Sequence, residues 1–304
     1  MTGIKSAPPY LRYWFAMKPA DEEISMSYKT VLAVLDTQRN AIQITDFAVA
    51  LAEQFSAHLI GVHAETLAAI PLIAPMEIPD PAAIEILQDT AHKETAAIEQ
   101  IFRQRTTREG LSSEWRSFML AAGYSSSSVQ ETARAVDLVV ATQSDPTQTD
   151  HRADLESFLF ESGRPMLLVP YTLKQLKPIE RVLIAWNGSR EAARATFDSL
   201  PLLKNATSVE ILVVDPPERG DRSPELAGAE IAAALSRHGV SVTLTTQDSG
   251  GTSPAQAIEK RLVDQSIDLL VMGGYGHSRW WEMLFGGVTR SLLDKMTALT
   301  LLSR

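Results

Sequence analysis

The chain has 304 residues, of which 45% are hydrophobic and 21% charged, so it has the composition of a globular protein and room for two domains of about 150 residues each. Its formal net charge of -9 opposes binding to nucleic acid or to anionic lipid, because neither polyanion would meet a basic surface. The lack of cysteine excludes disulfides, thiolate catalysis and Cys-ligated metals, and it favours a reducing, cytoplasmic location. No apolar run approaches the ~20 residues of a membrane span, so we expect a soluble protein.

Residues 1–25 fit no repeat unit and form an N-terminal extension, which is either an arm or the product of an upstream start. From residue 26 onward the chain repeats itself. Residues 31–36 align with 182–187 at an offset of 182 − 31 = 151, and 60–62 align with 211–213 at the same offset. Residues 137–140 align with 268–271 at 268 − 137 = 131, so the first copy carries 151 − 131 = 20 additional residues, which we place between 67 and 112.

This repeat predicts two domains, 26–172 and 178–304, with a polar linker over 171–177 that ends at Pro178. Each copy alternates short apolar, β-branched runs with helical patterns, which predicts βαβ units and a parallel sheet covered on both faces. The runs 166–169 and 299–302 complete five strands in each copy. The buried face of the first helix is predicted to comprise Ile44, Phe47, Ala48, Leu51 and Phe55, and its counterpart in the second copy Ala193, Phe197 and Leu200.

Two serines are expected to cap helices rather than to act as nucleophiles. Ser253, Pro254 and Gln256 stand in the order of an N-cap, a first-turn proline and the third residue of a capping box. Ser127 with Gln130 repeats the box without the proline.

A glycine-rich stretch directly follows the apolar run 268–272: residues 273–276 read GGYG and residues 286–289 read GGVT. Glycines at the end of a strand permit positive φ and close approach to a ligand, and a following helix, predicted over 288–295, offers free N–H groups to an anion. The stretch therefore predicts a phosphate site, with a tight turn as the alternative. His277, Arg279 and Arg290 either add positive charge to this site or lie in solvent.

With this loop, residues 28–304 resemble the universal stress protein family in its tandem two-domain form. The resemblance implies an α/β fold of two tandem five-stranded parallel-sheet domains, Rossmann-like and similar to the adenine nucleotide alpha hydrolases, paired as a pseudo-dimer. ATP-binding members carry G-x2-G-x9-G-[ST] after the fourth strand, and Gly273, Gly276 and Gly286 match this motif. Gly287 stands where the family has Ser or Thr, and Thr289 is the candidate replacement for the hydroxyl.

The resemblance also places the ends of the first two strands of the second copy at the nucleotide. Asn187 replaces an Asp near the nucleoside; it keeps hydrogen-bonding capacity but lacks the carboxylate suited to a ribose diol. Trp186 packs either on the base or in the core. The expected nucleotide-binding residues are Asn187, Val213, Val214, Asp215, Gly273, Gly276, His277, Gly286, Gly287, Val288 and Thr289.

The first copy is expected to have lost nucleotide binding. It keeps Asp36 after its first strand, but Thr142 stands in the place of Gly273, and residues 144–146 contain no glycine. Negative charge lies where phosphates would bind, from Asp145, Asp150 and Asp154. The proline-rich segment 69–81 is a loop on its own domain, a lid over a different ligand or a partner surface.

No catalytic constellation stands out, because the chain has no metal-binding histidine spacing, no GxGxxG after a first strand and no Walker A motif. His63 and His277 are the two candidate catalytic residues if the protein is an enzyme. Two classes of function survive: a stress or signalling protein that binds ATP or AMP, with or without Mg²⁺ and with at most slow hydrolysis, or an interaction module whose first copy binds another ligand or a protein partner. Pairing of the fifth strands would give a monomeric pseudo-dimer, and a homodimer of such chains is the other expected state.

Overall fold

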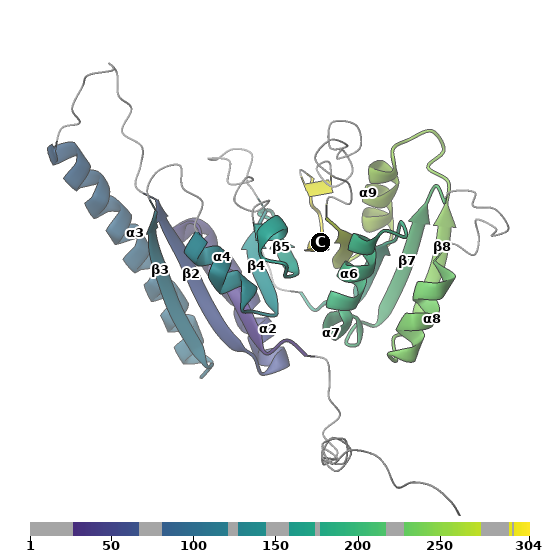
Figure 1. Ribbon diagram of the computed structural model, residues 1–304, viewed down its shortest axis with the longest axis horizontal. Coiled ribbons are helices and arrows are strands. Elements are labelled where there is room, and N and C mark those ends of the chain that lie inside the picture. The colour runs from purple at the N-terminus through teal and green to yellow at the C-terminus, as the bar shows by residue number, and fades with distance from the viewer. Residues whose placement is uncertain are drawn as a thin grey trace, which may run out of the picture.

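The computed structural model describes residues 27–66, 81–120, 127–143, 158–173, 177–216, 228–274, 292–293 and 295–304. These residues form one ten-stranded sheet flanked by helices (Figure 1). The strands of the first half are β1 (Thr30–Val34), β2 (His58–Thr66), β3 (Ser113–Leu120), β4 (Leu138–Thr142) and β5 (Met166–Val169). Those of the second half are β6 (Arg181–Ala185), β7 (Ser208–Val214), β8 (Val242–Gln247), β9 (Leu269–Gly273) and β10 (Leu299–Ser303).

The strand order is β3-β2-β1-β4-β5-β10-β9-β6-β7-β8, and every neighbouring pair within a half is parallel. The two halves meet where β5 pairs antiparallel with β10, with Leu167 opposite Leu301 and Leu168 opposite Thr300. The prediction of two five-stranded parallel sheets joined through their fifth strands is confirmed.

The sheet has helices on both faces. They are α2 (Gln38–Phe55), α3 (Pro81–Arg108), α4 (Ser127–Arg134), α6 (Arg190–Asp198), α7 (Leu200–Leu203), α8 (Ala229–Arg237) and α9 (Pro254–Asp264). The additional residues of the first copy lie between β2 and β3, as predicted: strand-to-strand spacing is 113 − 66 = 47 there and 242 − 214 = 28 between β7 and β8. Much of this segment is the 28-residue helix α3, which runs beside β2 and β3 (Figure 1).

Successive strand residues enter two different cores, because the side chains of a strand alternate between its faces. In β1, for example, Val31 and Ala33 join a core with α2, α3, α7 and α8, whereas Leu32 and Val34 join a second core with α4 and α9. The first core extends without interruption across the β5–β10 seam, since Leu167 and Leu299 both belong to it. Hydrophobic burial therefore joins the two halves in addition to the strand pairing.

The predicted face of α2 is confirmed, because Ile44, Phe47, Ala48, Leu51 and Phe55 are all buried. The predicted face of its counterpart is wrong. Helix α6 ends at Asp198, and Leu200 begins α7, so the i, i+4, i+7 relation is broken. The α6 residues that are buried are Glu191, Ala192, Ala195 and Thr196, while Phe197 is 37% exposed.

Helix starts follow local capping chemistry. Ser253 accepts a hydrogen bond from Gln256 N, and the Gln256 side chain accepts one from Ser253 N, which is the predicted capping box. Thr37 and Asn40 form a second box at α2 that was not predicted. Ser127 is already a helical residue of α4, so it is not the N-cap residue that was predicted.

Candidate functional site

The carboxyl ends of β6, β7 and β9 lie side by side, because β6 pairs with both other strands. The chain leaves β6 toward β7 on one side, whereas β9 returns to pair on the other side, so the space between β6 and β9 is a topological switch point. Ligands of open α/β sheets bind outside the strand ends at such points. Asn187 and Asp215 follow β6 and β7, and Gly273 is the last residue of β9. Three of the predicted site residues therefore lie at the edge of the sheet where the site was expected.

Apart from Val213 and Val214, the other predicted site residues follow Gly274 in the sequence. Gly276, His277, Gly286, Gly287, Val288 and Thr289 lie outside the described residues, as do Arg279 and Arg290. Their roles stay predictions.

Gly273 makes a close approach to the protein itself. A methyl group placed on it would lie 2.6 Å from Ala192 N and 2.7 Å from the carbonyl carbon of Glu191, both in the first turn of α6. Gly273 and Gly274 do not adopt the positive φ that glycine permits. The physical need at residue 273 is space for a helix that packs directly on the strand end, which the small buried residues Ala192 and Ala195 of α6 also provide.

The first turn of α6 already holds a negative charge of the protein. The side chain of Glu191 is only 3% exposed, and its Oε1 accepts a hydrogen bond from Arg190 Nε at 2.5 Å. Burial acts to raise the pKa of Glu191, but hydrogen bonds from Arg190, from its own backbone N–H and from Ser189 outweigh burial and hold the pKa below its ordinary value. A carboxylate at this place satisfies the positive end of the helix. An anionic ligand would therefore have to be held by other donors. No sequence pattern indicates this arrangement beyond an acidic residue shortly after Ser189.

Asn187 shapes the turn into α6. Its Oδ1 accepts a hydrogen bond from Ser189 N at 3.0 Å, Gly188 between them has φ +73°, and Ser189 caps the helix by accepting from Ala192 N. The side-chain NH₂ of Asn187 is exposed and has no partner in the described part of the chain. It can donate to a ligand without disturbing the turn.

The β7 residues divide between the two faces of the sheet. Val213 is buried in the first core, whereas Val214 packs toward the second core. Trp186 packs against the first core as well, next to Val213 and Gly228, which favours the core role over base stacking. Asp215 adopts φ +49°, and its Oδ1 accepts from Ser249 N at 2.8 Å. The Asp215 carboxylate thus ties the end of β7 to the loop before α9.

The equivalent edge of the first half has different chemistry. Thr142 ends β4 in the place of Gly273; it is buried, and its Oγ1 has no hydrogen-bond partner in the described chain. Gln143 is also buried and donates from Nε2 to Leu293 O of the second half at 2.6 Å. Asp36 precedes the Thr37 cap of α2. Asp145, Asp150 and Asp154 lie outside the described residues.

A pseudo-symmetric contact links the two halves at these positions. Gln143 corresponds to Gly274, because 274 − 143 = 131, and Leu159 corresponds to Leu293, because 293 − 159 = 134, the offset that separates the last residues of β5 and β10. On one side the Gln143 amide donates to Leu293 O. On the other side Gly274 packs against Leu159, whose Cδ2 would lie 2.6 Å from a methyl group on the glycine. One half uses a hydrogen bond where the other uses close packing.

His63, one of the two histidines considered for catalysis, contacts the backbone of a neighbouring strand end. His63 is buried, and its Nδ1 lies 2.5 Å from Leu35 O of the neighbouring strand end. Two residues further along β2, the buried Glu65 accepts from Thr95 Oγ1 at 3.0 Å and lies 2.8 Å from His92 Nδ1, an ion pair when His92 is protonated. This polar cluster between β2 and α3 was not predicted. His277 lies outside the described residues.

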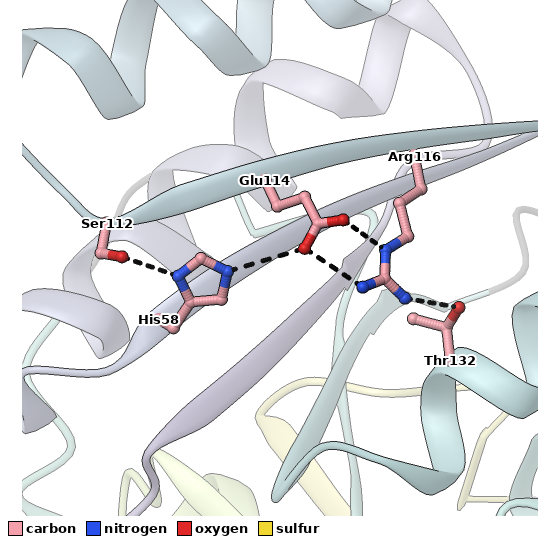
Figure 2. Close-up of polar contacts among 5 residues, drawn as sticks. All are labelled: His58, Ser112, Glu114, Arg116 and Thr132. Carbon is pink, nitrogen blue, oxygen red and sulfur yellow. Dashed lines mark hydrogen bonds and ion pairs between the residues drawn. The ribbon is translucent and has the colours of Figure 1, made fainter.

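A second polar array lies at the amino ends of β2 and β3 (Figure 2). His58 Nδ1 is 2.8 Å from Ser112 Oγ, and His58 Nε2 is 3.9 Å from Glu114 Oε2, an order that resembles a serine, histidine and acid triad. The geometry does not support that chemistry, because 3.9 Å exceeds a hydrogen bond and both Glu114 oxygens accept from Arg116. Hydrogen bonding to Arg116 lowers the pKa of Glu114, and Thr132 accepts from the same guanidinium. The array is an exposed ion-pair network.

Within the described ranges, no group of three or more acidic or histidine side chains is arranged to hold a metal ion. No helix among them has both the length and the apolar character needed to cross a bilayer.

The fold can be compared with known proteins. No protein-family model matches the chain, and no curated protein matches it. A universal stress protein from Archaeoglobus fulgidus DSM 4304 superposes with a TM-score of 0.67 at 15% identity, covering 90% of this chain and 96% of that one. A Pseudomonas aeruginosa UCBPP-PA14 protein assigned to the universal stress proteins has a TM-score of 0.55 at 15% identity, with 91% and 93% covered.

The chain therefore has the fold of the two-domain universal stress proteins. The cytoplasmic domain of a prokaryotic cation chloride cotransporter also superposes, with a TM-score of 0.50 at 11% identity, covering 91% of this chain and 95% of that one. Because a transporter domain has this architecture too, the function has to be argued from the site rather than from the fold.

Proposed function

We propose that this chain is a cytoplasmic universal stress protein, with domains at 26–172 and 178–304, that binds ATP or AMP at the β6, β7 and β9 strand ends of the second domain. It acts as a stress-response or signalling protein whose bound nucleotide biases a conformation or a partner surface, with at most slow hydrolysis. The observation that supports the proposal most directly is the placement of Asn187 and Gly273 at one switch point, with the GGYG sequence leaving β9 from Gly273.

The described residues supply the nucleoside part of this site. Asn187 presents a free NH₂ group, suited to a ribose oxygen or a base acceptor. Val213, Val214 and Asp215 provide the end of β7 for the adenine, mainly through their backbone, since Val213 faces the core and the Asp215 carboxylate is bonded to Ser249 N. Any Mg²⁺ would be held through the phosphates, given the lack of a metal cluster in the described part of the chain.

The phosphates are assigned to the loop that begins at Gly273. The carboxylate of Glu191 already occupies the first turn of α6, so that helix start would repel a phosphate rather than attract it. The donors have to come from the residues after Gly273, where the sequence places Gly276, Gly286 and Gly287 together with Thr289. In the first half, Thr142 and the acidic residues after it argue against an equivalent site, and we expect one nucleotide per chain.

Calorimetric titration with ATP and AMP tests the proposal. Asn187→Asp keeps the acceptor for Ser189 N and introduces a carboxylate for the ribose hydroxyls, so it should bind the nucleotide more tightly than wild type. Asn187→Ala removes one hydrogen-bonding side chain and should weaken binding by about two- to tenfold. Asp36→Ala at the equivalent place in the first half is the matched control and should leave the affinity unchanged.

The alternatives give different results. A stoichiometry of two, or an effect of Asp36→Ala equal to that of Asn187→Ala, would contradict the assignment to the second half. The lack of any binding at millimolar nucleotide would contradict the proposal as a whole and favour the interaction-module class.

A further inference from the structure

A groove of about 300 Å³ lies at the seam between the halves, away from the strand ends described above. Helix α2 forms one wall with Ala50 and Gln54, and the segment that enters β6 forms the other with Lys177 and Ile179. Leu167 of β5 and Leu299 of β10 lie beneath them, on the two strands that join the halves. Small-molecule sites begin at about this volume and occur preferentially where domains meet.

The interior of the groove is apolar. Leu167 is fully buried and Leu299 is 4% exposed, so the two strands close the floor and offer no free backbone group. The accessible apolar lining comes from Pro178, which is exposed, and from the half-buried Ala50 and Ile179. Ala50 contributes a methyl group only, at a place in α2 where a longer side chain would fill the groove. Such a lining favours an apolar body, because each CH₂ removed from water contributes to binding.

The rim carries two free polar groups. Lys177 and Gln54 are both exposed, and neither has a hydrogen-bond or ion-pair partner among the described residues. An ammonium is a compact cationic donor for a carboxylate, and the amide adds two further N–H donors. Lys177 is the one cationic side chain among the described residues that line the groove, so it favours a ligand with a single negative charge.

We propose that this seam groove binds a monocarboxylate with an apolar body, the carboxylate at Lys177 and Gln54 and the body against Ala50, Pro178 and Ile179. An aliphatic acid of about eight carbons suits the volume at protein packing density. Such a ligand contacts both halves and the segment between them, so its occupancy stabilises their arrangement by mass action. The site is separate from the nucleotide edge, and the proposal holds whether or not a nucleotide binds.

Calorimetry on the full chain with octanoate tests the site, with hexanoate and octylamine as comparison ligands. Octanoate should bind about 15-fold more tightly than hexanoate, since each methylene contributes roughly a fourfold gain. Octylamine has the same body with the opposite charge and should bind at least about tenfold more weakly than octanoate. Saturating ATP should leave the octanoate affinity unchanged.

Three variants locate the binding. Lys177→Gln should weaken octanoate binding by about tenfold, whereas Lys204→Gln, at the end of α7 and outside the groove lining, should have no effect. Ala50→Phe should abolish binding by filling the groove, with thermal melting to establish that the variant is folded. The lack of octanoate binding at millimolar concentration, equal binding of octylamine, or an unchanged affinity of Lys177→Gln would each overturn the proposal, and the lysine variant decides the outcome even if Ala50→Phe does not fold.

Discussion

Substitution of Gly273 by alanine should force the first turn of α6 away from the end of β9. The added methyl group would lie 2.6 Å from Ala192 N, 2.7 Å from Glu191 C and 2.9 Å from Glu191 Cβ, where ordinary contacts begin at 3.4 Å. Two of these three atoms are backbone, so no rotamer change relieves the overlap. The helix has to retreat by up to 3.4 − 2.6 = 0.8 Å.

The steric overlap should destabilise the fold by more than the change from glycine to alanine stabilises it. Overpacking of this kind typically costs ~1–3 kcal/mol, whereas alanine recovers ~0.5–1 kcal/mol over glycine in a strand because the unfolded chain is less free. A net loss of about 1–2 kcal/mol is expected in the free energy of unfolding, which corresponds to ~2–3 °C in Tm for a chain of this length. Nucleotide affinity should fall too, since the retreat displaces the turn that holds Asn187.

Urea unfolding, thermal melting and ATP titration measure these effects, and two other glycines serve as controls. Gly274→Ala meets Leu159 Cδ2 at 2.6 Å, the movable end of a side chain, and should cost less than Gly273→Ala. A methyl group on Gly239 would meet no atom within 4 Å, but Gly239 has φ +79°. Gly239→Ala should therefore lower the free energy of unfolding by about 1 kcal/mol and leave the nucleotide affinity unchanged. A Gly273→Ala variant as stable as wild type, or less harmful than Gly274→Ala, would refute the packing argument.

Three further predictions concern charges and caps. Glu191 has a lowered pKa, so its contribution to stability is complete above its ordinary value of 4.5 and is lost as the pH falls through the folded value. Glu191→Gln should therefore be less stable than wild type at pH 7, and urea titrations should show the difference narrowing as the pH falls below 4.5. Arg261→Met leaves the 11%-exposed carboxylate of Glu210 without its ion-pair partner and should lower the free energy of unfolding by about 2 kcal/mol. A double variant that adds Glu210→Leu should lose less stability, and equal losses would contradict the ion-pair argument. Ser253→Ala should cost about 1 kcal/mol and Ser253→Asp much less, and the reverse order would show that the cap is unimportant.

The architecture was predictable because its signals are local and repeated. Apolar runs at fixed offsets located the strands of both halves, including 166–169 and 299–302. The Ser253 cap was predictable for the same reason. The pairing of β5 with β10 was expected from the edges of these strands and from the family resemblance, not from the runs themselves. Where a pattern spanned a break, the prediction failed: Leu200 belongs to α7, so the predicted face of α6 was displaced and Phe197 was left exposed.

The contacts that shape the site were harder to predict, since they join residues far apart in the chain. A glycine after a strand is compatible with ligand approach, with positive φ or with helix packing, and the sequence at Gly273 does not distinguish them. The contact of Gly273 with Glu191 and Ala192 becomes visible only in the folded structure. The Gln143–Leu293 hydrogen bond likewise spans 150 residues and has no local pattern.

The antiparallel join of β5 to β10 within a single polypeptide has a consequence for how the two halves can vary. In a dimer of identical chains, each substitution appears on both sides of the axis, so a change that suits one site is imposed on the other. Here each side varies alone, and a Gln143 amide can face Leu293 while Gly274 faces Leu159 across the same seam. The join is also intramolecular, so dilution does not separate the halves. A single chain can thus keep one set of residues at the strand ends of one half and a different set at those of the other.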